Sequence, residues 1–222
     1  MRYNKVFSGK FIYLIPFGLI FLLNLFITQI KGFEYAGQLA VFLASSSFLA
    51  IILGMRWDVS LLTKPLDKSG MNIIYGLISI AVISIFFFCL LIMAYFFSGI
   101  FNTSLGLILL ASVLIAISEL LINIFLKFKK SSYYLIFRSL PYIFLFFISF
   151  LDFSIEASWI FSSLFSLFLL VLISAKYFFE LNFIHIKSLT FAINEIALKI
   201  IPTISAVVTN SIMLFWLVYI QH

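Results

Sequence analysis

The stretch SGMNIIYGLISIAVISIFFFCLLIMAYFFSGIFNTSLGLILLASVLIAIS, residues 69–118, decides the fold, because it holds 50 consecutive residues without a charged side chain. A single α-helix of that length would be about 75 Å long, whereas the hydrocarbon core of a bilayer is about 30 Å thick. The stretch must therefore fold back on itself. The cluster of small and polar residues from Ser98 to Ser104 predicts where it turns, since such residues end one helix and cap the next.

Shorter uncharged runs cover most of the remaining chain, each about as long as a bilayer is thick. Only 10% of the residues are charged and the mean hydropathy is +1.24, whereas a soluble domain carries about a quarter charged residues. We therefore predict an all-α fold, a polytopic membrane helix bundle that uses the lipid bilayer as its solvent. The predicted spans are residues 11–30, 37–60, 71–97, 104–126, 133–151, 157–178 and 200–220.

Basic residues sort between the predicted connections in a way that sets the topology. Thirteen of the fourteen Lys and Arg residues fall at the N-terminus or in alternate connections, and Lys31 alone falls on the other side. By the positive-inside rule, the N-terminus is predicted to lie in the cytoplasm. The net charge of +6 is therefore a topology signal, and nucleic acid is not an expected partner.

The spans divide the chain into three predicted parts. Residues 1–179 form an N-terminal lobe of six spans, and residues 200–222 form the first span of an incomplete second lobe. Residues 180–199 link the two, with Leu189, Ile193 and Ile196 on one helical face and Glu195 and Lys199 on another. This pattern predicts an amphipathic cytoplasmic helix at the membrane interface, with a solvated loop as the alternative.

Enzyme chemistry is not expected from this sequence. Cys89 stands alone in an apolar run, and no His/Cys spacing typical of a metal site, no phosphate-binding glycine loop and no order typical of a Ser/His/Asp triad is present. The predicted connections are short and leave no room for a soluble catalytic domain. We therefore expect no cofactor beyond a coupling proton or sodium ion.

Short motifs in the first lobe carry a family resemblance. They are FEYAGQL at residues 33–39, GMRWDVS at 54–60, KPLDK at 64–68, and FKKSSYY at 128–134 followed by Arg138. Together they resemble the O-antigen flippase, or polysaccharide biosynthesis protein, family of the multidrug/oligosaccharidyl-lipid/polysaccharide exporter superfamily. The first motif is similar to the turn between that family's first two helices, although Glu34 lacks the preceding proline usual there.

The resemblance implies a function and a location. It implies a flippase that moves an undecaprenyl-pyrophosphate-linked oligosaccharide, an O-antigen or capsular repeat unit, across the bacterial inner (plasma) membrane. Family members have two six-helix lobes around a central cavity. This chain would supply one lobe, the linker and one further helix, as a fragment, a frameshifted product or a half-length protein that pairs with a second lobe or another copy.

Glu119 and Arg138 are the charged residues set deepest in the predicted spans. Glu119 lies about 12 Å inside the fourth span and Arg138 about 9 Å inside the fifth, so the side chains of these antiparallel neighbours can meet. A charge at this depth requires a partner or a water-filled cavity. Two interpretations are open: a structural ion pair, or an Arg138 that binds pyrophosphate beside a Glu119 that takes a coupling ion. Asn123, one turn from Glu119, could hydrogen-bond it in either case.

Arg56 and Asp58 lie near the cytoplasmic end of the second predicted span. On one continuous helix they would point to nearly opposite sides and could not pair with each other. Arg56 is expected either to reach the headgroups as an anchor or to line a cavity and bind a diphosphate through paired hydrogen bonds.

Other functional classes remain open at this stage. One alternative is the six-span permease subunit of an ATP-driven polysaccharide exporter, which requires a separate nucleotide-binding subunit. Another is a membrane glycan polymerase or acyltransferase, although such enzymes usually need a large outer loop or a His/Asp cluster. A nonfunctional truncated product is the fourth possibility, after the flippase, the permease and the enzyme.

Overall fold

The computed structural model describes residues 15–63, 69–98, 103–151 and 153–178, together with the isolated positions Leu198 and Thr203. Within these ranges the chain is all-α, as predicted, and holds no strand. The linker predicted at 180–199 and the span predicted at 200–220 lie outside the described residues, apart from those two positions. The helices are α2 (Ile15–Lys31), α3 (Phe33–Gly54), α4 (Trp57–Thr63), α5 (Ser69–Ser98), α6 (Thr103–Lys127), α7 (Ser131–Ile148) and α8 (Ile155–Phe178).

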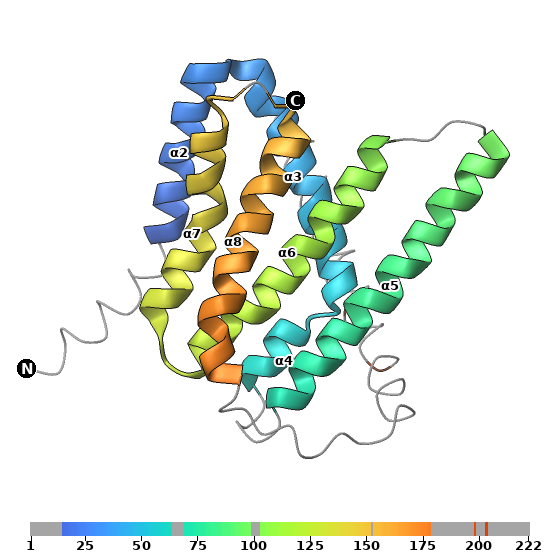
Figure 1. Ribbon diagram of the computed structural model, residues 1–222, viewed down its shortest axis with the longest axis vertical. Coiled ribbons are helices and arrows are strands. Elements are labelled where there is room, and N and C mark those ends of the chain that lie inside the picture. Colours follow the sequence, from blue (N-terminus) through green and yellow to red (C-terminus); the bar gives the residue numbers. More distant parts are fainter. Residues whose placement is uncertain are drawn as a thin grey trace, which may run out of the picture.

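The long helices run alternately up and down (Figure 1). α2 and α3 form one antiparallel pair and α7 and α8 another, while α5 diverges from the bundle toward its C-terminal end. This order places Arg56, Lys127 and Lys176 at one end of the bundle and Lys31 at the opposite end. The separation of charges by end is thus present in the fold, and the cytoplasmic placement of the basic end stays a prediction.

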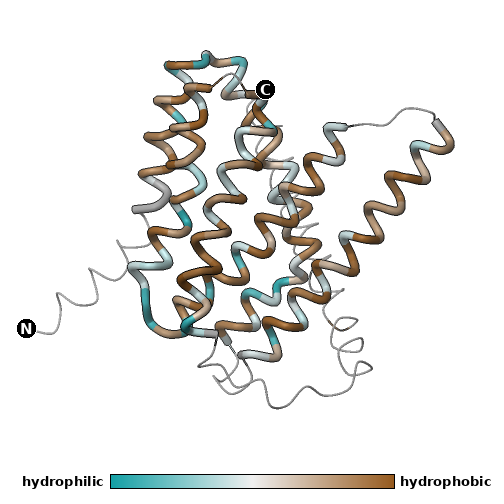
Figure 2. The backbone as a smooth tube through the Cα atoms, in the orientation of Figure 1, coloured by the Kyte–Doolittle hydropathy of each residue, from teal (hydrophilic) through white to brown (hydrophobic). Residues whose placement is uncertain are grey.

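Five helices, α3, α5, α6, α7 and α8, are long and apolar enough to cross a membrane. Most of their residues are apolar, with a few hydrophilic positions between them (Figure 2). Large side chains such as Phe86, Phe97 and Phe168 face outward, each more than half exposed. Such surfaces are stable only against lipid, so the chain is a multi-pass membrane protein.

The second predicted span differs from the structure at both ends. Its connection to the first span was expected at residues 31–36, but only Gly32, with φ 91°, separates α2 from α3. Residues 33–39, expected in a turn, therefore form the first turns of α3. The span was also expected to continue to residue 60, whereas the helix breaks at Met55 and Arg56, and a separate helix α4 follows.

Helix α6 is the centre of the bundle and packs against α3, α4, α5, α7 and α8. Near its C-terminal end, Phe125 stacks on Phe137 at 5.4 Å between ring centroids and meets Tyr177 edge-on at 5.5 Å. Tyr133 contacts the same ring at 5.4 Å. We call Phe125, Tyr133, Phe137 and Tyr177 the aromatic cluster; it joins α6, α7 and α8.

Small residues allow the helices to approach closely elsewhere. On α8, Ser158, Ser162 and Ser166 recur every four residues and all are buried. The hydroxyls of Ser162 and Ser166 donate to the carbonyls one turn earlier, at 2.7 and 2.8 Å. A serine hydroxyl that bonds its own helix can be buried without a partner on the next helix, which suits packing inside a membrane.

Candidate functional site

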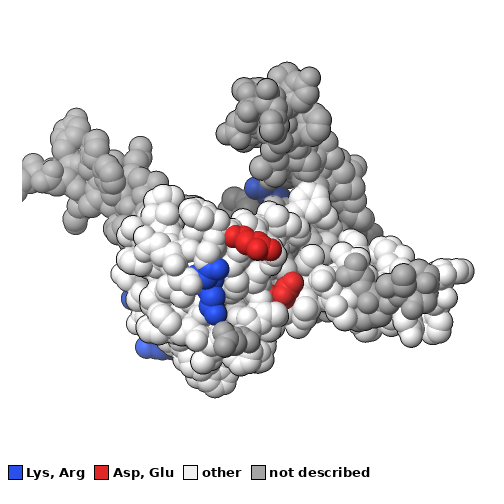
Figure 3. Space-filling view, turned by 90° about the horizontal axis from the view of Figure 1, so that it is seen from above, with Lys and Arg blue, Asp and Glu red and all other residues white. Residues whose placement is uncertain are grey.

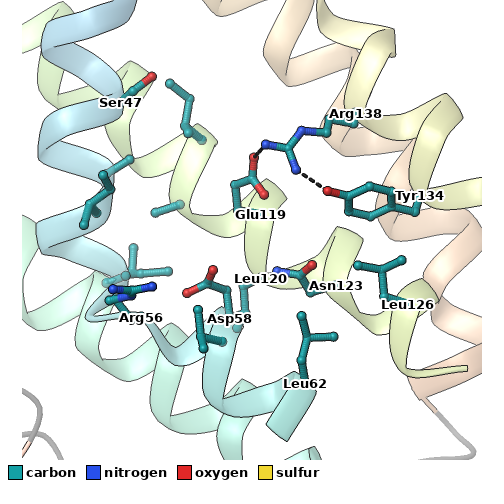
Figure 4. A pocket seen from close by; sticks show the side chains of 17 residues that line it. Ser47, Arg56, Asp58, Leu62, Glu119, Leu120, Asn123, Leu126, Tyr134 and Arg138 are labelled. Carbon is teal, nitrogen blue, oxygen red and sulfur yellow. Dashed lines mark hydrogen bonds and ion pairs between the residues drawn. The ribbon is translucent and has the colours of Figure 1, made fainter. Parts of the chain in front are cut away.

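A cavity of about 1010 Å³ opens between α3, α4, α6 and α7 (Figure 4). Its volume is at the upper end of the range for small-molecule sites, about 300–1,000 Å³. It lies nearer the basic end of the bundle, where α3 breaks and α7 begins. Its polar and charged lining residues are Ser47, Arg56, Asp58, Glu119, Asn123, Tyr134 and Arg138, and the rest are apolar or glycine.

One face of α6 forms the back wall of the cavity. Ala116, Glu119, Asn123 and Leu126 line it, at spacings of three and four residues. Such a spacing places side chains along one side of a helix. The opposite side of the same helix carries Phe125 and the aromatic cluster, so α6 separates a charged cavity from an apolar core.

Glu119 and Arg138 meet across this cavity, which confirms that their side chains pair. The Arg138 Nη2 lies 3.7 Å from the Glu119 Oε1. Arg138 also donates a hydrogen bond to the hydroxyl of Tyr134, and its guanidinium lies 5.5 Å from the centre of the Tyr134 ring. The side chains of Arg138 and Glu119 remain 31% and 38% exposed. The pair is therefore accessible from the cavity.

The break between α3 and α4 brings Arg56 and Asp58 to the same cavity. The expectation that they point to opposite sides assumed one continuous helix. Met55 and Arg56 instead adopt left-handed conformations, with φ of 43° and 53°. The chain is redirected there, and both side chains line the cavity. No ion pair joins them in the described part of the chain, and Arg56 is exposed.

The break between α3 and α4 is held by the packing of Trp57 against α5. Trp57 is fully buried, and its ring lies 5.6 Å from the ring of Tyr75 on α5. Gly76 on α5 lies so close to α4 and α6 that a Cβ there would be 2.8 Å from Leu120 Cδ2 and 3.1 Å from Trp57 Cβ. The cavity thus has a rigid floor, made by a glycine at a close helix approach.

Asn123 lines the cavity one turn from Glu119 and is only 6% exposed. The hydrogen bond to Glu119 that the sequence suggested is not formed. Within the described ranges, no partner accepts from or donates to the Asn123 amide. Its amide atoms are not among the fully buried polar atoms that lack a partner, so the amide is open to solvent through the cavity.

The structure brings together all four residues singled out in the sequence: Arg56, Glu119, Asn123 and Arg138. Sequence reasoning did not assign Asp58 or Tyr134 to the site. Tyr134 could have been found from its position four residues before Arg138, since residues at that spacing meet on a helix. Asp58 could have been found from the glycine at position 54, which favours a helix end, followed by an acid suited to the start of a new helix.

The opposite end of the bundle has a different character. Viewed from that end, a small group of acidic and basic side chains is surrounded by uncharged surface (Figure 3). Lys31 donates there to the carbonyl of Leu151 at 3.5 Å, and the Gln38 amide donates to Glu34 at 3.4 Å. The first contact joins the end of α2 to the segment after α7, and the second lies within α3. The charged cavity at the other end remains the candidate site.

Known proteins offer no match to this chain: no protein-family model, no curated protein and no solved structure is significantly similar to it.

Proposed function

We propose that the chain is one lobe of a membrane transporter that moves a lipid-linked oligosaccharide with an anionic pyrophosphate head, as the resemblance to the O-antigen flippase family implies. The observation that carries the proposal is the pair of arginines that reach one cavity of an apolar bundle, Arg56 from the break between α3 and α4 and Arg138 from α7. Charges are costly in a membrane protein and are commonly retained where they act on a substrate.

Guanidinium groups suit such a head group. Arginine presents several N–H donors in a planar fork that matches phosphate oxygens, and it stays charged in a partly dry site. Arg56 is exposed, and no acid lies within ion-pair distance of it in the described residues. Arg138 is held by Glu119 at 3.7 Å, longer than a good charged hydrogen bond of about 2.8 Å. The Arg56 guanidinium is therefore open to a bound phosphate, whereas the Arg138 guanidinium, which also donates to the Tyr134 hydroxyl, would exchange its loose contact with Glu119 for one.

The surroundings of the cavity suit the lipid part of the same substrate. The outer surfaces of α5 and α8 carry exposed apolar side chains, so a polyprenyl chain would stay in the bilayer while its head enters the cavity. In this proposal the lobe pairs with a second lobe or another copy, which closes the cavity and allows alternating access. The protein would lie in the bacterial plasma membrane and would transport without chemical change to the substrate.

A flipping assay tests the proposal. The chain is reconstituted into liposomes that contain a fluorescent polyprenyl-pyrophosphate-linked sugar, and the fraction of label accessible to a membrane-impermeant quencher is followed over time. We expect the wild-type chain to flip the lipid, and the double variant Arg56→Gln/Arg138→Gln to do so at least roughly tenfold more slowly, since one charged phosphate contact contributes about 1.5–3 kcal/mol.

The matched control is Lys176→Gln, which removes an exposed positive charge at the same end of the bundle but outside the cavity. It should flip at the wild-type rate. Equal rates for the control and the double variant would contradict the proposal, and no flipping by the wild-type chain alone would contradict its pairing with another copy. Flipping that required ATP and an added nucleotide-binding subunit would favour the exporter permease instead.

A further inference from the structure

The turn between α6 and α7 gathers lysines at the basic end of the bundle. Lys127 ends α6, and Lys129 and Lys130 follow in the turn, which is a hydrophilic segment between two apolar helices (Figure 2). Lys127 has a structural role, because its Nζ donates to the Leu62 carbonyl near the end of α4, at 3.4 Å. Lys129 and Lys130 are exposed and lie outside the lining of the cavity. The turn therefore presents two positive charges to the surroundings of the protein.

The backbone of this turn is fixed, so the two lysines have defined positions. The Lys130 N–H donates to the Phe125 carbonyl at 2.7 Å, and the Lys129 N–H donates to the Leu126 carbonyl at 3.0 Å. These two bonds form a Schellman motif, in which one residue adopts a left-handed conformation that glycine usually provides. Lys129 occupies that position, with φ 57°. A lysine that keeps this costly conformation motivates a functional hypothesis for its side chain.

A third lysine reaches the same place from α8. The ring of Tyr177 lies 5.3 Å from the ring of Phe128 in the turn and 5.5 Å from the ring of Phe125 on α6. Lys176 precedes Tyr177 and is exposed, and the end of α8 lies beside the turn at the basic end of the bundle (Figure 1). The aromatic contacts thus bring together exposed charges from two distant parts of the sequence. We call these three residues the lysine patch: Lys129, Lys130 and Lys176.

No acid balances the lysine patch in the described part of the chain. The described acids lie elsewhere, because Asp58 and Glu119 line the cavity and Glu34 and Glu156 lie at the opposite end of the bundle. Within the same ranges, none of the three ammonium groups has an ion-pair or hydrogen-bond partner. An exposed group of positive charges without acids attracts anions.

The surroundings of the lysine patch are those of a membrane surface. Helices α7 and α8 are both long and apolar enough to cross a membrane, and each has one end at the patch. Ile136 on α7 and Leu172 on α8 are 53% and 58% exposed, and they lie about 6–9 Å further along their helices than the lysines. Tyr133 and Tyr177 lie between the charges and these apolar side chains, as in the aromatic belt at a membrane interface. A molecule bound here would meet positive charge at one level and apolar surface just below it.

We propose that the lysine patch binds the headgroup of an anionic phospholipid and anchors the basic end of the bundle at the membrane surface. The phosphate lies among the three ammonium groups, and the acyl chains lie along the apolar surfaces of α7 and α8. Basic clusters beside membrane spans bind acidic lipids through this complementarity of charge. The patch is separate from the cavity, so this inference does not depend on the proposed function.

A lipid competition assay on the purified full chain tests the inference. Pyrene-labelled phosphatidylglycerol is bound in detergent micelles and detected by energy transfer from the tryptophans of the protein. Unlabelled phosphatidylglycerol should displace it at about a tenfold lower concentration than phosphatidylcholine with the same acyl chains, and the preference should fall as salt is added, because salt screens exposed charges. Inorganic pyrophosphate should not displace it, because it has no acyl chains.

Substitutions locate the binding. Lys129→Gln, Lys130→Gln and Lys176→Gln should each weaken binding of phosphatidylglycerol about fivefold, and the triple glutamine variant at least about twentyfold. The triple arginine variant keeps the charges and should bind as the wild-type chain does. Lys31→Gln, at the opposite end of the bundle, is the control with a single charge removed and should also keep the wild-type affinity.

Three results would overturn the inference. A triple glutamine variant that kept the preference for phosphatidylglycerol would place the lipid elsewhere. Displacement by pyrophosphate as effective as by phosphatidylglycerol would make the patch a site for free phosphate. Equal affinities for phosphatidylglycerol and phosphatidylcholine would point to an acidic protein segment as the partner. None of these results concerns the arginines of the cavity, so each would leave the proposed function standing.

Discussion

Helix α6 has two sides with opposite chemistry, and residues next to each other in the sequence, such as Phe125 and Leu126, lie on different sides. On one side, Phe125 is fully buried in the aromatic cluster with α7 and α8. On the other, Glu119 and Asn123 face a cavity of about 1010 Å³ that also holds two arginines. Helix α7 repeats the division, with Phe137 in the cluster and Tyr134 and Arg138 at the cavity.

The comparison indicates how stability and function are distributed in this chain. The aromatic cluster is tightly packed and uncharged, so its residues should stabilise the bundle. The cavity holds charges that cost free energy to bury and are only partly paired, so its residues should contribute little to stability. Substitutions on the two sides of α6 should therefore differ in what they change, and the following predictions test that difference.

The largest effect is expected for Phe125→Ala in the aromatic cluster. Truncation removes contacts with three rings and leaves a cavity, which costs about 3–5 kcal/mol in soluble proteins. We expect a loss of unfolding free energy of about 3 kcal/mol, at the lower end of this range. Lipid already solvates apolar groups, so only the packing contribution is lost. The free energy of unfolding in mixed micelles measures it.

Phe97→Ala is the control for this truncation, since Phe97 is 87% exposed at the end of α5. It should change the free energy of unfolding by less than about 0.5 kcal/mol. Equal losses in the two variants would show that the aromatic cluster does not hold the bundle together.

A smaller loss is expected for Gly76→Val, on the floor of the cavity. A Cβ at this position would be 2.8 Å from Leu120 and 3.1 Å from Trp57, so α5 must move away from α4. Overpacking of this kind costs about 1–3 kcal/mol. Gly37→Val places the same side chain on α3, where nothing lies within 4 Å of the added Cβ, and should leave the midpoint of thermal unfolding nearly unchanged. A cavity floor that accepted valine without loss would contradict the rigid support described above.

The third prediction concerns the ion pair itself. Glu119→Gln and Arg138→Gln should each lower the free energy of unfolding by about 1 kcal/mol or less, because the two groups are 3.7 Å apart and about one-third exposed. The double variant should cost less than the sum of the two, and the difference measures the coupling. A loss of about 3 kcal/mol or more in either single variant would instead establish the pair as a structural lock between α6 and α7.

Sequence patterns predict the fold well where the physical cause is local. The thickness of the bilayer sets the length of the helices. The uncharged run at 69–118 predicts the position of the turn between α5 and α6 correctly. The meeting of Glu119 and Arg138 follows from two antiparallel neighbours and a short turn. Both inferences need only distances along a helix.

The break after Gly54 depends on tertiary packing and was missed. The sequence from residue 37 to 60 has no proline, so its apolar pattern favours one helix. The structure shows that burial of Trp57 against Tyr75 and Gly76 redirects the chain, at the cost of two left-handed residues. The cavity membership of Arg56 and Asp58 depends on this break. For that reason the site was only partly predictable, although its deepest residues were found.

The last prediction isolates the backbone strain at the break. Arg56 has φ 53°, a conformation that costs a residue with a Cβ about 1–2 kcal/mol and costs glycine almost nothing. Arg56→Gly and Arg56→Ala both remove the charge, and only glycine relieves the strain. Glycine loses about 0.5–1 kcal/mol more conformational freedom on folding, so Arg56→Gly should be more stable than Arg56→Ala by roughly 0.5–1 kcal/mol.

Lys129 provides the matched test outside the cavity, because it has φ 57° in the exposed turn between α6 and α7. Its glycine and alanine variants should differ by a similar amount, since the backbone strain is the same. Pyrophosphate titration should then separate the two sites: both Arg56 variants lose affinity, and both Lys129 variants keep it. Equal stability of Arg56→Gly and Arg56→Ala, beside a clear difference at Lys129, would mean that the break relaxes when the arginine is removed. The arginine itself would then be holding α4 in place, and the division between a stabilising cluster and a functional cavity would not extend to this residue.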